Sequence, residues 1–173
     1  MNKLWSRNIL RFVILILLQV FVLREINLSS SQTQFIYVII YPLAILLLPV
    51  GLPQFFVLLI SFITGFIVDA FYTSPGVHAG ACLWLSLARP LALKWLEPKS
   101  GYGAGQYPTG ESLGIFWFMK YMSTLMIVFF FFYFTLEIFT FVYLSQILLK
   151  TILSFIVSVF LIFLLQILFN PKY

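Results

Sequence analysis

The chain has 173 residues, of which 62% are hydrophobic and only 9% are charged, and its formal net charge is +5. Soluble domains average about 45–50% apolar and about 25% charged residues, so this composition excludes an ordinary soluble protein and predicts an integral membrane protein. The ten lysines and arginines are too few and too scattered to form a surface that binds nucleic acid.

Six apolar segments, taken in chain order, predict an all-α fold: a compact bundle of six transmembrane helices that forms one membrane domain over residues 1–173. The predicted helices cover residues 9–23, 35–48, 54–72, 77–96, 113–138 and 145–169. The second helix is short for a hydrocarbon core about 30 Å thick, and it ends at the turn "PVGLP". The turn "TSPG" follows the third helix, and a polar, glycine-rich loop over residues 97–112 follows the fourth.

The first predicted helix also resembles a secretory signal peptide, because it is short and follows three basic residues, Lys3, Arg7 and Arg11. No small-x-small cleavage site follows it, and the chain continues "REINLSSSQTQ". We therefore expect an uncleaved membrane anchor.

Basic residues predict the orientation, because cytoplasmic loops of membrane proteins are enriched in lysine and arginine. Six crossings place the amino terminus, the 97–112 loop and the carboxyl terminus on one side, together with all the basic residues except Arg24 and Lys150. Both termini and the 97–112 loop are therefore expected in the cytoplasm.

Several charged residues flanked by apolar sequence are expected together at the opposite, outer end of the bundle. They are Arg24, Glu25, Asp69, Glu137 and Lys150, with His78 beside them. Lys150 and Glu137 can extend their polar ends to the interface, but Asp69 is too short to do so. It needs a donor, and the candidates are Lys150, Arg24, His78 and the backbone of "TSPG". Two interpretations of Asp69 follow, a polar clamp between helices or a site for a ligand or a proton.

Small residues and a proline shape the third and fourth predicted helices. Gly65 lies one turn before Asp69 on the same helix face, and the fourth helix opens with "HAGAC", so these helices are expected to pack closely at their outer ends. Pro90 leaves the carbonyl of Ser86 without its helical donor. Arg89 is interpreted as a snorkelling side chain at this kink, or as a donor to loop or partner carbonyls.

The chemistry of a catalytic or metal site is missing from the sequence. One histidine and one cysteine cannot build a zinc or haem site from these residue types, and a single cysteine excludes an internal disulfide. A single aspartate excludes an aspartyl protease pair. The loop "GYGAGQYPTGE" lacks the GK[ST] ending of a phosphate-binding loop. The chain is therefore not expected to be an enzyme or to bind a cofactor or a metal.

One stretch, "GFIVDAFYTSPGVHAGACLWLSLARP", carries the most specific pattern, made by Gly65, Asp69, Gly76, His78, Arg89 and Pro90. A second stretch, "FFFFYFTLEIFTF", carries the acid-phenylalanine pattern of Glu137 and Phe139. In order and spacing, over nearly the whole chain, these residues resemble the MreD family of rod-shape-determining membrane proteins.

The resemblance implies a non-enzymatic subunit of the bacterial cytoplasmic (inner) membrane. Members of this family associate with MreC, a bitopic protein with a periplasmic coiled coil, and work with MreB, RodA and a penicillin-binding transpeptidase in lateral peptidoglycan synthesis. The expected function is thus a multi-pass scaffold that binds MreC and supports cell shape. The motif residues, with Lys150, become candidates for structural or partner-binding roles.

The same family has a fold thought to be similar to the substrate-binding subunits of energy-coupling-factor vitamin transporters, which supplies an alternative function. Binding a solute requires a cavity lined by polar groups from several helices. The candidates are few and thinly spread: Gln19, Thr64, Ser86, Ser123, Thr124 and Gln146.

Overall fold

A computed structural model describes residues 2–23, 35–103 and 105–169. The regular structure in this part of the chain is entirely helical. The long helices are α1 (Asn2–Phe21), α3 (Gln54–Tyr72), α4 (Val77–Trp95), α6 (Ile115–Ile138) and α7 (Leu144–Phe169). The short ones are α2 (Pro42–Leu46), α5 (Gly110–Leu113) and the 3-10 helix η2 (Phe141–Tyr143).

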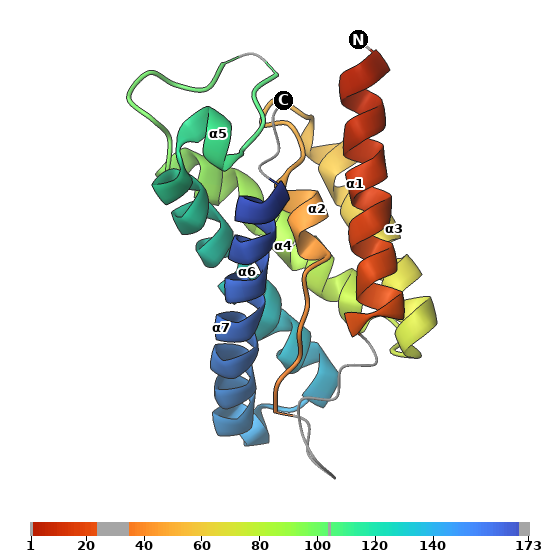
Figure 1. The fold of residues 1–173 in the computed structure, drawn as a ribbon. Helices are drawn as coiled ribbons and strands as arrows, with labels where there is room; N and C mark the ends of the chain where they lie inside the picture. Colours follow the sequence, from red (N-terminus) through yellow and green to blue (C-terminus); the bar gives the residue numbers. More distant parts are fainter. Residues whose placement is uncertain (1, 24–34, 104, 170–173) are drawn as a thin grey trace.

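The long helices run up and down one bundle (Figure 1). Helix α4 packs between α3 and α6, α7 packs against α6, and α1 lies beside α3. The start of α1, the 97–112 loop and the end of α7 lie at one end of the molecule, named here the loop end. The α3–α4 turn and η2 lie toward the opposite end, named the turn end.

Three helical segments are long and apolar enough to cross a membrane, namely Gln54–Tyr72, Ile115–Ile138 and Leu144–Gln166. Only 33%, 39% and 28% of their apolar windows are buried within the chain, so large side chains such as Phe66 and Ile156 face outward. Helix α4 has 19 residues but is less apolar, and the apolar part of α1, Phe12–Phe21, is shorter than a span. The fold therefore has the character of a membrane protein.

The helix predicted over residues 35–48 is wrong. Residues 35–40 form an extended, non-helical segment, and only Pro42–Leu46 is helical, as α2. Proline explains this boundary, because inside a helix its ring would clash with the carbonyl of residue 38, whereas the first helical position needs no N–H donor. The β-branched run of Val38 and its two successors also suits an extended chain.

One edge of the extended segment is paired with α7. The N–H of Tyr37 donates to the Ser154 hydroxyl at 2.9 Å, and the N–H of Ile39 donates to the Ser158 hydroxyl at 3.0 Å. Ser158 in turn donates to the carbonyl of Tyr37 at 3.3 Å. The two serines lie four residues apart and therefore on one helix face, where they replace the neighbouring strand that an extended chain requires.

The other edge is paired with α1 through Gln19. Its amide oxygen accepts the N–H of Ile40 at 2.8 Å, and its amide nitrogen donates to the carbonyl of Val38 at 3.0 Å. The same nitrogen donates to the hydroxyl of Tyr72 at 2.8 Å, which ties α3 to this junction. An extended segment among helices needs partners for its backbone groups, and Gln19 supplies partners for the N–H of Ile40 and the carbonyl of Val38.

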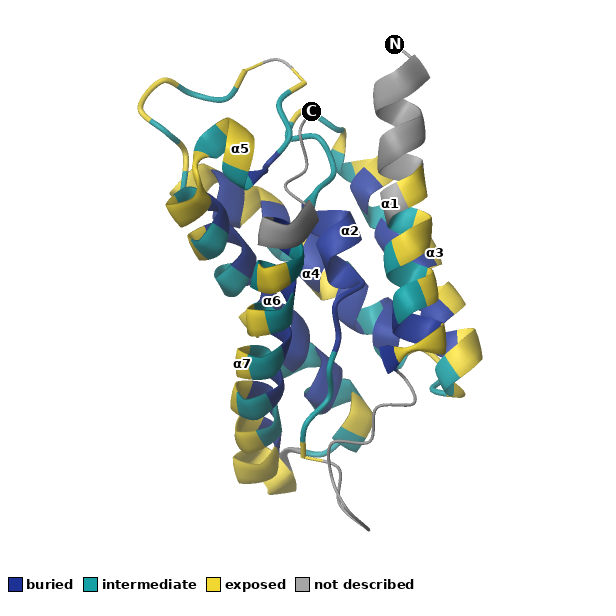
Figure 2. Ribbon diagram, in the orientation of Figure 1, coloured by how far each residue is buried: buried dark blue, intermediate teal, exposed yellow. Residues whose placement is uncertain are grey.

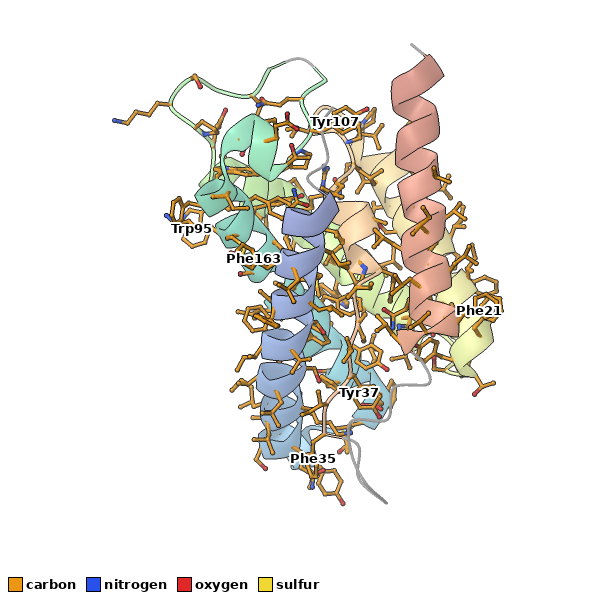
Figure 3. The ribbon with its side chains drawn as sticks, viewed as in Figure 1. Phe21, Phe35, Tyr37, Trp95, Tyr107 and Phe163 are labelled. Atoms are coloured by element: carbon orange, nitrogen blue, oxygen red, sulfur yellow. The ribbon has the colours of Figure 1, made fainter. Side chains whose placement is uncertain are left out.

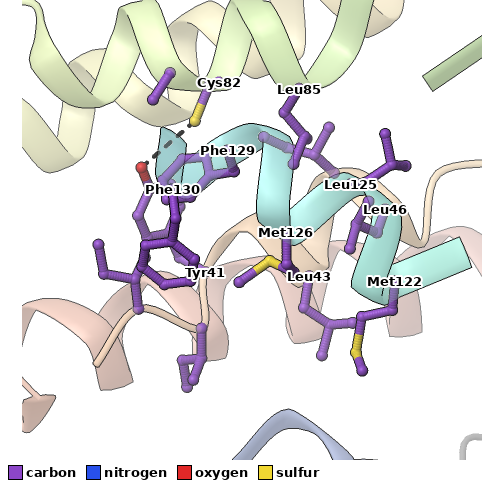
Figure 4. Close-up of a cluster of buried hydrophobic side chains, with 14 of the residues drawn as sticks. Tyr41, Leu43, Leu46, Cys82, Leu85, Met122, Leu125, Met126, Phe129 and Phe130 are labelled. Atoms are coloured by element: carbon purple, nitrogen blue, oxygen red, sulfur yellow. Dashed lines mark hydrogen bonds between the residues drawn. The ribbon is translucent and has the colours of Figure 1, made fainter. Parts of the chain in front are cut away.

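The extended segment and α2 lie in the interior, between helices that expose their outer faces (Figure 2). Every residue of α2 is buried. Its Leu43 and Leu46 pack with α6 side chains such as Met122 and Met126, and with Leu85 of α4 (Figure 4). The central apolar core thus forms around the extended segment and the short helix α2 rather than around one continuous helix.

Boundaries in the second half also differ from the predicted ranges. The helix predicted over residues 113–138 is divided at Gly114, whose φ of 89° favours glycine. Before it, Thr109 caps α5 by accepting the N–H of Ser112 at 3.2 Å. Helix α4 ends at Trp95, and α7 begins at Leu144 directly after η2.

Candidate functional site

Two buried polar clusters lie at different ends of α4. The Asp69 cluster is at the turn end and contains Asp69, Ser74, His78 and Tyr41. The Arg89 cluster is nearer the loop end, and it joins Arg89 and Tyr121 to the turn that follows α2. These clusters contain the least expected groups in an apolar bundle, so they are the candidates for function.

Asp69 holds the beginning of α4 against the end of α3. Only 4% of the residue is exposed, and its two carboxylate oxygens each accept a backbone N–H, from His78 and from Ala79, both at 2.9 Å. The hydroxyl of Ser74 donates to it at 3.0 Å. Gly76 occupies the N-cap position with a φ of 85° and has no capping side chain, so Asp69 supplies the cap from another helix. The negative charge also complements the helix dipole.

This geometry favours the clamp interpretation of Asp69. Of the donors proposed from the sequence, the backbone of His78 is used, Lys150 is not, and Arg24 lies outside the described residues. Gly65 contributes to the same junction, because a Cβ there would lie 2.5 Å from the Cα of Ala79. The close approach expected between the third and fourth helices is therefore present.

Replacing Asp69 with alanine is expected to lower the free energy of unfolding by about 1–2 kcal/mol, since it leaves two N–H groups of α4 unpaired. Unfolding of the purified protein by SDS titration measures this loss. Ser74→Ala is the matched control and should cost less, because it removes one partner from the carboxylate and no partner from the helix backbone. Equal stability of Asp69→Ala and the wild type would contradict the clamp.

His78 is fully buried behind Asp69. Its Nδ1 lies 2.9 Å from the hydroxyl of Tyr41, to which Cys82 also donates at 3.4 Å (Figure 4). The rings of Tyr72 and Tyr133 lie 5.0 and 4.9 Å from the imidazole. Nε2 has no hydrogen-bond partner among the residues that the structure describes. His78 therefore joins α4 to Tyr41, the residue that precedes α2, by one hydrogen bond, and it joins α4 to α3 and α6 by ring contacts.

Glu137 and Lys150 lie at the same end of the bundle as Asp69, as expected, but among the described residues neither bonds to Asp69. They pair with each other at 3.5 Å, from the end of α6 to the beginning of α7. Tyr37 donates its hydroxyl to Glu137 at 3.0 Å, and the Lys150 ammonium lies 5.6 Å from the Tyr37 ring. This second polar junction holds the start of the extended segment at the turn end.

Arg89 is buried, with 2% of its surface exposed, so the interpretation as a snorkelling residue is wrong. One terminal nitrogen donates to the carbonyls of Leu48 and Pro49 at 2.5 and 3.1 Å, and Nε donates to the hydroxyl of Tyr121 at 3.1 Å. Tyr121 donates in turn to the carbonyl of Leu46 at 3.1 Å. The guanidinium therefore satisfies carbonyls at and after the end of α2, where a positive charge is favoured.

The carbonyl that Pro90 leaves without its helical donor is satisfied from α3. The side-chain amide of Gln54, the first residue of α3, donates to the carbonyl of Ser86 at 2.8 Å. Pro90 therefore provides an acceptor that fixes the start of α3 against the middle of α4.

The described residues of the 97–112 loop are bonded to the bundle. The backbone carbonyl of Gln106 accepts the N–H of Val50 at 2.9 Å, and the hydroxyl of Tyr102 donates to the carbonyl of Leu93 at 2.7 Å. Burial, with the nearby Glu97, raises the pKa of Tyr102 to about 12, so this hydroxyl keeps its proton at neutral pH. The loop thereby covers the loop end of α4.

Sequence reasoning missed Gln54, Tyr121, Ser154 and Ser158 as partners of the backbone, and it considered Gln19 only as a possible cavity residue. A usable signal was present. The two serines are spaced by four residues in the otherwise apolar stretch 152–165 of α7, which places both hydroxyls on one face. Their partner, the extended segment 35–40, could not be identified from that spacing alone.

No group of three or more histidine, cysteine, aspartate or glutamate side chains in the described ranges is arranged to hold a metal ion. The two clusters are instead built from single charges bonded to backbone groups. Comparison with known proteins found no matching family model, no matching curated protein and no matching solved structure.

Proposed function

We propose that this chain is a non-enzymatic scaffold subunit of the MreD type in the bacterial elongation complex, located in the cytoplasmic membrane. Its direct partner is an MreC-like bitopic protein, and its output is lateral peptidoglycan synthesis and cell shape, through RodA, a penicillin-binding transpeptidase and MreB. The observation that carries the proposal is the use of the buried charges, which fasten the helices to one another.

Two of these buried charges and one buried neutral amide illustrate this use. Asp69 binds the beginning of α4, Arg89 binds the turn after α2, and Gln19 binds the extended segment. Each satisfies backbone groups of another element. A bundle fixed by such contacts presents rigid outer helix faces, which suits the docking of another membrane helix. The sequence resemblance to the MreD family supplies the partner.

The proposal includes six membrane crossings, one of them discontinuous. Six extended residues, 35–40, rise about 3.3 Å each, and the next seven, through residue 47, rise about 1.5 Å each, which together span about 30 Å. The loop end then faces the cytoplasm, in accord with the exposed Lys94, Lys99 and Lys120 at that end.

The transporter alternative receives less support. The hydroxyls of Thr64, Ser86 and Thr124 all donate to carbonyls of their own helices, at 2.6, 2.8 and 2.8 Å. Gln19 is engaged on both sides of its amide group. Few of the polar side chains proposed to line a solute cavity are therefore available for a solute.

Co-expression with an MreC-like protein, followed by purification of this chain in mild detergent, tests the scaffold. We expect the partner to be retained in a stoichiometric amount and depletion of the chain to round rod-shaped cells. Native mass spectrometry of the same material distinguishes the alternative. A stoichiometric vitamin-sized ligand, without a retained partner, would overturn the scaffold in favour of a transporter subunit.

A further inference from the structure

Trp84 is held in a fixed position on the outer face of α4. Its side chain is 45% exposed, and its ring lies flat on that of Phe132 from α6, with centroids 4.1 Å apart and an interplanar angle of 3°. An indole stacked in this way cannot turn freely, so its N–H points in a direction that the bundle sets.

The indole N–H of Trp84 has no acceptor in the described part of the chain, whereas Trp117 donates its own to the carbonyl of Leu96 at 2.5 Å. Along α4, Trp84 lies about 10 Å from Val77 and about 16 Å from Trp95. In the proposed topology this depth is inside the hydrocarbon, where acyl chains offer no acceptor and an unpaired N–H is costly. Tryptophan normally lies at the interface instead.

The surface around Trp84 is apolar and includes a small residue. Ala88, half-buried, lies one turn after Trp84, and a small residue at such a position lets another backbone approach. Leu87 and Leu91, which are 48% and 71% exposed, extend the same apolar surface toward the loop end. These residues, with Trp84, are named here the Trp84 face.

We propose that the Trp84 face seats a transmembrane helix of the partner, and that this helix brings a hydrogen-bond acceptor to the indole N–H. The acceptor is a serine or threonine hydroxyl or a side-chain amide carbonyl. A protein helix is required rather than lipid, because lipid ester carbonyls lie at the interface and not at this depth. The inference rests on the proposed scaffold function and adds its docking surface and chemistry.

The test measures binding of a labelled MreC-like protein to the full chain in nanodiscs. Trp84→Phe removes the N–H and keeps a ring that can stack on Phe132. We expect binding to weaken about three- to twentyfold, the range of an interhelical hydrogen bond in a membrane. Trp95→Phe is the matched control. Trp95 is 75% exposed at the end of α4 (Figure 3). Water can satisfy its indole N–H there, so binding should not change.

Photo-crosslinking keeps the inference testable even if Trp84→Phe folds poorly. A photoreactive residue at Leu87 should capture the partner, and one at Phe62 of α3, which is similarly exposed at 44%, should not. Capture only from position 62, capture of lipid alone from position 87, or equal binding of Trp84→Phe would overturn the inference while leaving the scaffold intact. A wild-type chain that binds no partner would instead overturn the scaffold, and this inference with it.

Discussion

Gly65→Ala is expected to destabilise the protein by about 2–3 kcal/mol, the largest effect of any single added methyl group in the described bundle. A Cβ at this position would lie 2.5 Å from the Cα of Ala79, 2.6 Å from the carbonyl oxygen of His78 and 2.7 Å from the nitrogen of Ala79. All three atoms belong to backbone, which cannot rotate away. The methyl group would therefore push α3 from the start of α4 and disturb the hydrogen bonds of Asp69.

Two other glycines provide controls for this prediction in the same SDS titration. Gly51→Ala should be neutral, because no atom lies within 4 Å of the added Cβ. Gly80→Ala should have an intermediate effect, because its Cβ would meet the end of the flexible Leu136 side chain at 2.6 Å. If Gly65→Ala is as stable as Gly51→Ala, the tight contact between α3 and α4 is not what holds this junction.

The elements that could be predicted from sequence are those whose ends are marked by local chemistry. Helix α3 covers the predicted range, 54–72, because Pro53 precedes it and "TSPG" ends it. Helix α4 begins where predicted for the same reason. Apolar composition alone could not distinguish a buried helix from a buried extended segment over residues 35–48. Pro42 is the local signal against a continuous helix.

For the polar clusters, the distance between partners along the chain decides which contacts could be predicted. Asp69 could be interpreted as a clamp because its donors lie within ten residues along the chain, across a short turn. The acceptors of Arg89 lie 40 and 41 residues away, in the turn after α2, whose position depends on the extended segment and α2. Ser154 and Ser158 bond a segment more than 100 residues distant. Such partners follow from the packing of the bundle, so sequence spacing could not reveal them.

Arg89→Met is expected to lower the free energy of unfolding by about 2–4 kcal/mol, because two partly buried carbonyls, of Leu48 and Pro49, lose their donor. An opposing effect exists, since methionine fills a similar volume and avoids the cost of burying a guanidinium. Removal of a buried charge is close to neutral when both partners are replaced by apolar groups. Here the partners are backbone carbonyls, which remain in place, so the loss should dominate.

Three variants separate these contributions in SDS titration. Lys94→Met removes an exposed charge from the last turn of the same helix and should change stability by less than about 0.5 kcal/mol. Arg89→Lys keeps the charge but cannot reproduce contacts to two carbonyls and to Tyr121 together, so it should also destabilise. Tyr121→Phe combined with Arg89→Met should be less damaging than the sum of the two single changes, because both residues serve one network. A fully additive pair, or an Arg89→Met protein as stable as the wild type, would show that Arg89 does not hold the turn after α2.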